Sequence, residues 1–163
     1  MSQKQLVYDT LADMGISFQS VEHPAVFTIE EMQKLDFPAK SRIAKNLFLR
    51  NAKGKRHFLV VVDADQRVNL KQMEQMLDCT KLSFASEERL QKYLGVSKGA
   101  ISPLGLINDT EHSVELYLDK KLREAETIGI HPNDNTATVL VNFDDLLKFF
   151  SATEHKVNLI DFQ

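Results

Sequence analysis

The chain has 163 residues, of which 43% are hydrophobic and 26% charged, as is typical of a soluble globular domain long enough to bury a core. Its longest apolar run, Phe58-Leu-Val-Val-Val62, is too short to cross a bilayer, and the N-terminal residues lack the apolar stretch of a signal peptide. A single cysteine excludes an internal disulfide, so we expect a cytoplasmic protein.

The formal net charge is −3, but the basic residues are unevenly distributed. Residues 37–62 contain seven Lys and Arg side chains and no Asp or Glu, which leaves the rest of the chain strongly acidic. Such segregation can attract a polyanion, and the alternative is a solvated hairpin with a basic turn.

The first half of the chain predicts two helices and three strands. Leu6, Val7, Leu11 and Met14 share one helical face, and Gly15 ends that helix. Residues 16–21 alternate as a short strand does. Thr28-Ile-Glu-Glu31 is a capping box that opens a helix to about residue 35. Residues 44–50 and 56–62 predict two strands joined by the turn Asn51-Ala-Lys-Gly54.

The second half continues this alternation of helices and strands. We expect helices over residues 70–77, 86–94 and 143–150, with Ser86 and Asn142 as N-caps and Gly95 as a stop. Strands are expected over residues 82–84, 114–118, 127–130 and 137–141, and the tail from residue 151 either adds a strand or packs on the surface. The pattern predicts a single α/β or α+β domain, residues 1–163, with a mixed sheet.

Several familiar catalytic signatures are absent from the sequence. It contains no phosphate-binding glycine loop, no dinucleotide fingerprint and no nucleophile elbow. The five histidines and Cys79 lack metal-ligand spacing, so we expect no metal and no cofactor. We expect Cys79 to be a buried small hydrophobic residue.

Three short segments are candidates for a site. Lys45 and Asn46 begin an apolar strand, where an ammonium and an amide can bind a phosphate, or Lys45 is simply a solvated strand-end lysine. Gly99-Ala-Ile-Ser-Pro103 is a loop whose backbone can approach a ligand oxygen, or a plain tight turn. His131 precedes a proline that fixes its direction, or is a structural histidine.

Together these segments resemble the bacterial YbaK/ProX family of prolyl-tRNA editing domains. The matching residues are His23-Pro-Ala-Val-Phe-Thr28, Ala44-Lys-Asn-Leu47, Gly99-Ala-Ile-Ser-Pro-Leu-Gly-Leu-Ile-Asn-Asp109 and Gly129-Ile-His131. The resemblance runs from about residue 6 to residue 150. It implies a partly curved mixed sheet flanked by helices. One departure is Ser97-Lys98 before Gly99, where many relatives have a proline-glycine pair, so Lys98 either adds a contact to RNA or loosens the loop.

The resemblance implies a trans-editing enzyme that hydrolyses mischarged Ala-tRNA(Pro) at its CCA end, with the substrate ribose hydroxyl assisting. By this analogy Lys45 and Gly99 are catalytic, Lys45 by anchoring the terminal phosphate or ribose. The expected substrate-binding residues are Phe27, Met32, Asn46, Ala100, Ile101, Ser102, Pro103 and His131. The expected tRNA-binding residues are Lys40, Arg42, Lys53, Lys55 and Arg56.

The expected partners are mischarged proline tRNA and, as the resemblance suggests, prolyl-tRNA synthetase. We expect a monomer with no membrane partner. Selectivity is expected to depend on size, with Val26, Phe27, Ile29, Met32 and Ile101 as candidate pocket walls that could equally be core residues. The alternatives are a Cys-tRNA(Pro) deacylase of the YbaK type, a non-catalytic tRNA-binding module and a regulatory domain of amino-acid metabolism.

Overall fold

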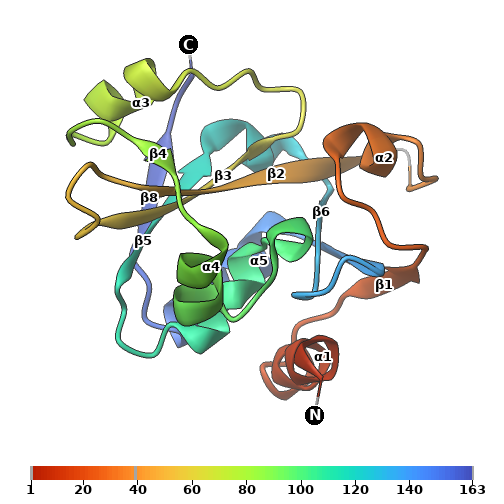
Figure 1. Cartoon of the computed structure of the whole chain (residues 1–163). Helices are drawn as coiled ribbons and strands as arrows, with labels where there is room; N and C mark the ends of the chain where they lie inside the picture. Colours follow the sequence, from red (N-terminus) through yellow and green to blue (C-terminus); the bar gives the residue numbers. More distant parts are fainter. Residues whose placement is uncertain (1, 39, 163) are drawn as a thin grey trace.

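The computed structural model describes residues 2–38 and 40–162, which form an eight-stranded mixed sheet with helices packed against it (Figure 1). The strands are β1 (Gln19–Glu22), β2 (Ser41–Arg50), β3 (His57–Asp63), β4 (Ser83–Phe84), β5 (Val114–Asp119), β6 (Thr127–Ile130), β7 (Ala137–Val141) and β8 (Val157–Ile160). The α-helices are α1 (Gln3–Asp13), α2 (Ile29–Gln33), α3 (Leu70–Met76), α4 (Glu87–Leu94) and α5 (Phe143–Ala152). Three short 3-10 helices are η1 (Lys98–Ala100), η2 (Pro103–Asn108) and η3 (Lys120–Glu124). The predicted α/β fold class is confirmed.

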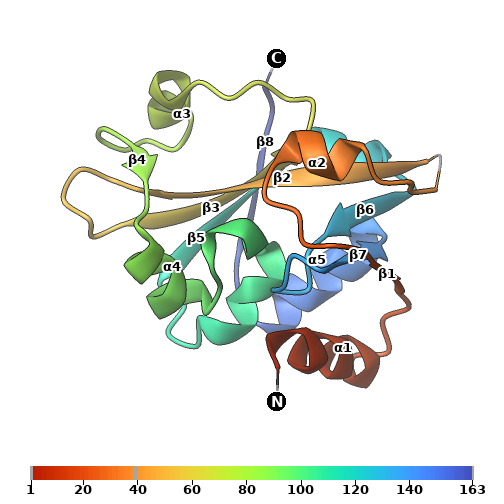
Figure 2. The ribbon, with the colours of Figure 1, turned by 45° about the vertical axis from the view of Figure 1, so that its right-hand side comes forward.

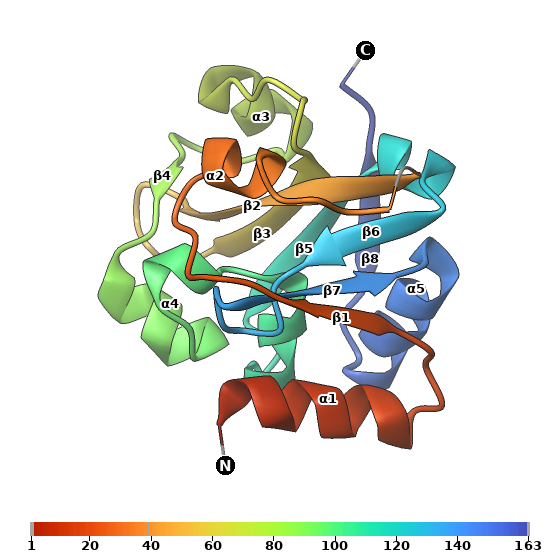
Figure 3. The same cartoon turned by 90° about the vertical axis from the view of Figure 1, so that its right-hand side faces the viewer.

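The strand order is β1-β7-β6-β2-β3-β5-β8, and β4 pairs with β2 beside this path. The pairs β2–β6, β3–β5 and β5–β8 are parallel, whereas the other pairs are antiparallel. Figure 3 shows β1, β7, β6 and β2 side by side at one end of the sheet. The long strand β2 links the two ends, since residues 41–43 pair with β6 and residues 44–50 with β3.

The sheet separates two apolar cores. On one face α1, α4, η2 and α5 bury the larger core, and on the other face α3 covers a smaller one (Figure 2). Strand β3 serves both, because Leu59 and Val61 enter the larger core while Phe58, Val60 and Val62 enter the smaller one. This explains why β3 is apolar without alternation in the sequence.

The predicted strand over residues 16–21 is wrong at its start, since β1 begins at Gln19. Gly15 adopts a left-handed conformation (φ 71°) after α1. Its N–H bonds to the carbonyl of Ala12 at 3.0 Å, and the Ile16 N–H bonds to the carbonyl of Leu11 at 3.0 Å. This Schellman cap uses the Ile16 amide and buries its side chain, so residue 16 belongs to the helix end.

Two other segments complete the sheet. Strand β2 begins at Ser41 rather than at residue 44, because Ser41–Ile43 pair in parallel with residues 127–129. The C-terminal tail forms β8, parallel to β5, which is one of the two outcomes expected from the sequence. Among the described residues, no helix has the length and apolar character needed to cross a membrane.

Candidate functional site

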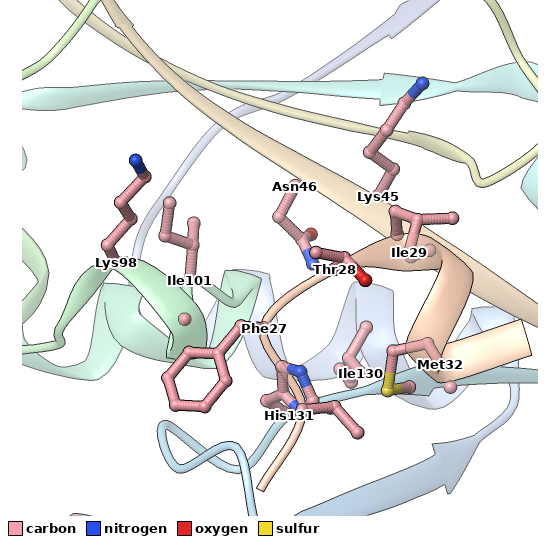
Figure 4. Close-up of a pocket in the computed structure, with 14 residues that line it drawn as sticks. Phe27, Thr28, Ile29, Met32, Lys45, Asn46, Lys98, Ile101, Ile130 and His131 are labelled. Carbon is pink, nitrogen blue, oxygen red and sulfur yellow. The ribbon is translucent and has the colours of Figure 1, made fainter. Parts of the chain in front are cut away.

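A pocket of about 140 Å³ opens where the segment entering α2, strand β2, the η1 loop and the end of β6 meet (Figure 4). Its lining residues are Val26, Phe27, Thr28, Ile29, Met32, Ala44, Lys45, Asn46, Lys98, Gly99, Ile101, Gly129, Ile130 and His131. On one edge β2 pairs with β6 through residues 41–43 and with β4 through residues 49–50. In the described chain the edge between these segments has no strand partner, and the pocket lies beside it.

The segment entering α2 forms one side of the pocket and is fixed at both of its ends. The Thr28 hydroxyl caps α2 by accepting from the Glu31 N–H at 3.1 Å, as the capping box predicts. Before it, the Val26 N–H donates to the Asn135 carbonyl, and the Asn135 amide donates to the Val26 carbonyl at 2.8 Å. Between these anchors Phe27 is 71% exposed at the pocket mouth. It therefore does not form an enclosed wall.

Asn46 and Lys45 point to opposite sides of β2, as neighbouring strand residues do (Figure 4). The Asn46 amide points toward His131, and its buried Oδ1 has no hydrogen-bond partner among the described residues. The Lys45 ammonium points the other way and donates to the Gln66 carbonyl at 2.7 Å. Lys45 is among the residues that line the pocket, but its charge lies on the Gln66 side of the strand.

His131 enters the pocket from the end of β6 and is held in one orientation. Its Nδ1 lies 2.9 Å from the Ala137 carbonyl, which can only accept, so Nδ1 carries the proton. Burial lowers the pKa of His131, with the nearby His23 acting in the same direction. A neutral ring protonated on Nδ1 leaves Nε2 as an acceptor, and no partner occupies it within the described chain.

Gly99 lies on the η1 loop, where the absence of a side chain permits close packing. A Cβ at this position would lie 2.9 Å from Cδ1 of Phe27 and 3.1 Å from Nδ2 of Asn135. Both distances are shorter than ordinary contacts, so any other residue would displace the Phe27 ring or Asn135. The glycine thus lets the η1 loop and the segment entering α2 approach each other across the pocket mouth.

The remainder of this loop divides between the pocket and the core. Ile101 lines the pocket, as predicted. Ala100, Ser102 and Pro103 are buried and do not line it, and the Ser102 hydroxyl accepts from the Leu104 N–H at 3.1 Å. They support the loop from beneath, so the expected direct contacts of these three residues with substrate stay a prediction.

The predicted tRNA-binding cations fall into two groups. Lys40 lies 3.7 Å from Glu126, Arg42 pairs with Asp63, and Arg56 donates to both carboxylate oxygens of Glu115 at 2.8 Å. Three of the five cations therefore have a carboxylate nearby, and the Lys40 pair is exposed to solvent. Lys53 and Lys55 are exposed in the β2–β3 turn and form no ion pair with a described residue.

The pocket also has lining residues that were not predicted from the sequence. Ala44, Gly129 and Ile130 lie in the family-like segments, but nothing in their chemistry marked them as pocket residues. Gly129 is needed because a Cβ there would lie 2.6 Å from Cδ1 of Ile43. Thr28 was expected only as a helix cap. Within the described residues, no group of three or more His, Cys, Asp or Glu side chains is placed to hold a metal ion.

The pocket suits a small group. Its volume of about 140 Å³ is close to that of a cavity of about 150 Å³ that holds benzene, and smaller than the roughly 300–1,000 Å³ of sites for larger ligands. Side chains of the size of alanine or cysteine fit such a space. Ile29, Met32 and Ile101 line this space and contribute to its shape.

The chain is similar to aminoacyl-tRNA editing proteins in both sequence and fold. The aminoacyl-tRNA editing domain family matches residues 23–149. Prolyl-tRNA editing protein ProX of Acetoanaerobium sticklandii is 47% identical over 161 residues, covering 99% of this chain and 98% of the relative. Prolyl-tRNA synthetase associated domain-containing protein 1 of Mus musculus is 36% identical over 156 residues, covering 93% and 92%. The crystal structure of a proposed trans-editing enzyme for prolyl tRNA synthetase has the same fold, with a TM-score of 0.73 at 21% identity over 96% of this chain and 95% of that chain.

Proposed function

The chain belongs to the aminoacyl-tRNA editing domain family, and from this premise we propose that it is a trans-editing deacylase that hydrolyses the alanyl ester of mischarged proline tRNA. Prolyl-tRNA synthetase would supply this substrate, and the reaction would take place in the cytoplasm. The observation that carries the proposal is the convergence of Asn46, Gly99 and His131 on a pocket that fits a small side chain.

The chemistry requires little from the protein. Water adds to the ester carbonyl carbon, the bond to the ribose oxygen breaks, and alanine leaves while the ribose regains its hydroxyl proton. An aminoacyl ester is already activated, and a neighbouring ribose hydroxyl can position the water. Orientation and stabilisation of the developing charge then supply most of the acceleration, which explains how a site without a nucleophile triad can work.

Two acceptors in the pocket match donors on such a substrate. Oδ1 of Asn46 is buried without a partner among the described residues, an arrangement that is unfavourable in the free protein and is relieved when a ligand donates to it. Nε2 of neutral His131 is the second acceptor. We assign Oδ1 to the α-ammonium group of alanine and Nε2 to the ribose hydroxyl.

Phe27 and Lys45 would bind the nucleotide that carries the ester. The exposed Phe27 ring at the mouth offers a face on which the terminal adenine can stack. Because the Lys45 ammonium lies beside Gln66, a terminal phosphate anchored by Lys45 would lie on that side of β2. The phosphate would then replace the Gln66 carbonyl as the partner of Lys45.

The same pocket volume favours a second candidate, a deacylase for cysteine on proline tRNA. Single-turnover deacylation of proline tRNA charged with alanine, cysteine or serine separates the two. We expect rapid loss of alanine by the wild-type protein and a large loss of rate in Lys45→Ala. Preference for cysteine would assign the second activity, and no hydrolysis of any ester would leave a non-catalytic tRNA-binding module.

A further inference from the structure

Five cations meet where the tip of the β2–β3 hairpin lies against α4. Arg50 ends β2, Lys53 and Lys55 lie in the turn, and Arg89 and Lys92 belong to α4. Figures 1 and 2 show the hairpin projecting beyond the body of the molecule, with α4 beneath it. We call these five residues the hairpin cationic surface. Arg50, Arg89 and Lys92 were not among the tRNA-binding residues predicted from the sequence.

Hydrogen bonds to neutral groups hold this surface in place. Nη1 of Arg89 donates to the Gly54 carbonyl at 3.1 Å and to Nε2 of His57 at 2.8 Å. Nη2 of Arg50 donates to the Ala52 carbonyl at 3.0 Å. A Cβ at Gly54 would lie 2.8 Å from Nη2 of Arg89 and 3.2 Å from Nη2 of Arg50, so the two guanidinium groups flank the same glycine. The turn therefore presents its charges from a fixed frame.

The charges of this surface are not neutralised. Among the described residues, none of the five cations lies within ion-pair distance of a carboxylate, in contrast to Lys40, Arg42 and Arg56. The positive charges also act on buried His57, whose pKa is lowered to about 4. Burial is the largest cause, followed by the charges of Arg89, Arg50 and Lys92. Like charges held together disfavour folding, and a polyanionic ligand relieves that repulsion.

We propose that the hairpin cationic surface binds the phosphate backbone of the acceptor arm of the tRNA whose aminoacyl end occupies the pocket, an inference that rests on the proposed function. Strand β2 connects the two places directly. Asn46 and Arg50 are four residues apart, which is about 13 Å along a strand, and the turn extends further. The phosphates that reach the surface would therefore lie a few nucleotides from the ester.

The test compares a charge-reversal variant with a matched control on two substrates. The variant is Lys53→Glu with Lys55→Glu, both exposed. The control is Lys148→Glu with Lys156→Glu, which makes the same charge change at exposed residues of α5 and of the segment before β8. The substrates are alanyl-tRNA(Pro) and alanine esterified to the trinucleotide CCA, which lacks the acceptor stem.

For the variant, kcat/KM on alanyl-tRNA(Pro) should fall at least about tenfold at 0.15 M salt, mainly through KM, and its log–log salt slope should decrease by about 2. Hydrolysis of the CCA ester should stay within about twofold of wild type, and the control should resemble wild type on both substrates. An unchanged salt slope, or an equal loss on both substrates, would overturn the proposal.

Failure of the proposed function would give a different result. If the wild-type protein hydrolyses neither ester, the deacylase assignment is wrong. Binding of uncharged proline tRNA then tests the hairpin cationic surface alone. A reduced salt slope in the Lys53→Glu, Lys55→Glu variant supports it, and an unchanged slope overturns it.

Discussion

The pocket and the hairpin cationic surface both contain groups that have no complementary partner among the described residues, but the groups differ. In the pocket a neutral acceptor, Oδ1 of Asn46, is buried without a hydrogen bond to any residue that the structure describes. At the hairpin Arg50 and Arg89 form hydrogen bonds, but neither has an ion-pair partner in the part of the chain that the structure describes. The first arrangement is suited to a hydrogen-bond donor at one point, over a short distance. The second attracts a polyanion over a longer range and depends on salt.

The largest expected effect comes from removing the pocket acceptor. Asn46→Ala should lower kcat/KM on alanyl-tRNA(Pro) by about a hundredfold, since an unpaired buried polar group costs roughly 1–3 kcal/mol and the substrate ammonium would lose its partner. The free energy of unfolding should stay the same or rise, because the substitution removes a buried acceptor that has no partner in the described chain. Single-turnover kinetics and urea denaturation measure the two quantities.

Asn46→Asp provides a matched comparison for this prediction. It keeps an acceptor at Oδ1 and loses the amide donor, so it should retain more activity than the alanine variant. Equal losses in both variants would assign the essential contact to the amide nitrogen and contradict the role given to Oδ1.

The pocket shape is tested by enlarging it. Ile101→Ala should raise hydrolysis of correctly charged prolyl-tRNA(Pro) by about tenfold, since a few methylene groups in an apolar pocket are worth roughly 1–3 kcal/mol. Ile107→Ala is the control, because Ile107 packs against the larger core and does not line the pocket. A gain in the control, or none in Ile101→Ala, would mean that proline is excluded in another way.

A smaller effect is expected from Gly99→Ala. The added methyl would displace the exposed Phe27 ring, so the deacylation rate should fall about fivefold. This is less than the roughly hundredfold loss that a misplacement of about 1 Å can cause. The stability should be largely kept, because the displaced ring is exposed. Gly105→Ala should instead lower the stability and largely keep the activity, since its Cβ would lie 3.1 Å from Cβ of buried Leu94. Thermal melting and deacylation rates for both variants check this contrast.

At the hairpin, pH should change stability rather than chemistry. The pKa of His57 is about 4 in the folded protein and about 6.5 in an unfolded chain, so the unfolded state binds more protons between these values. The free energy of unfolding is therefore highest above about pH 6.5 and decreases as the pH falls toward about 4. We expect a decrease of about 2 kcal/mol in the free energy of unfolding from pH 7 to pH 5.

Urea denaturation of wild type and His57→Gln at both pH values measures the contribution of His57. Glutamine keeps an acceptor for Arg89 without titrating, so the variant should show a shallower dependence on pH. An identical dependence would assign the slope to other groups.

The elements of this fold were largely predictable because their signals are local. The Ser86 and Asn142 caps, the turn after Asn51 and the alternating runs each act within a few residues. The first residues of β2 were missed because their parallel partner is 86 positions away, at Ser41 and Thr127. Nothing near Ser41 in the sequence shows that contact.

The candidate site was predictable as a set of segments but not in its geometry. Adjacent strand positions send Lys45 and Asn46 to opposite sides, and only the course of β2 decides which side is the pocket. Gly99 was expected to let the backbone approach a ligand, yet its missing side chain leaves room for Phe27, which comes from a segment more than 70 residues away. Of the hairpin cationic surface, the basic segment of residues 37–62 contains Arg50, Lys53 and Lys55. Arg89 and Lys92 join them from α4, and the sequence alone does not indicate that contact.

The most direct test of the deacylase assignment compares alanyl-tRNA(Pro) with prolyl-tRNA(Pro) under single-turnover conditions, using excess wild-type protein. The two substrates share the RNA and the ester and differ only in the amino acid that enters the pocket. Rapid release of alanine with retention of proline is the predicted result. Equal rates for both esters, or no hydrolysis of either, would contradict it.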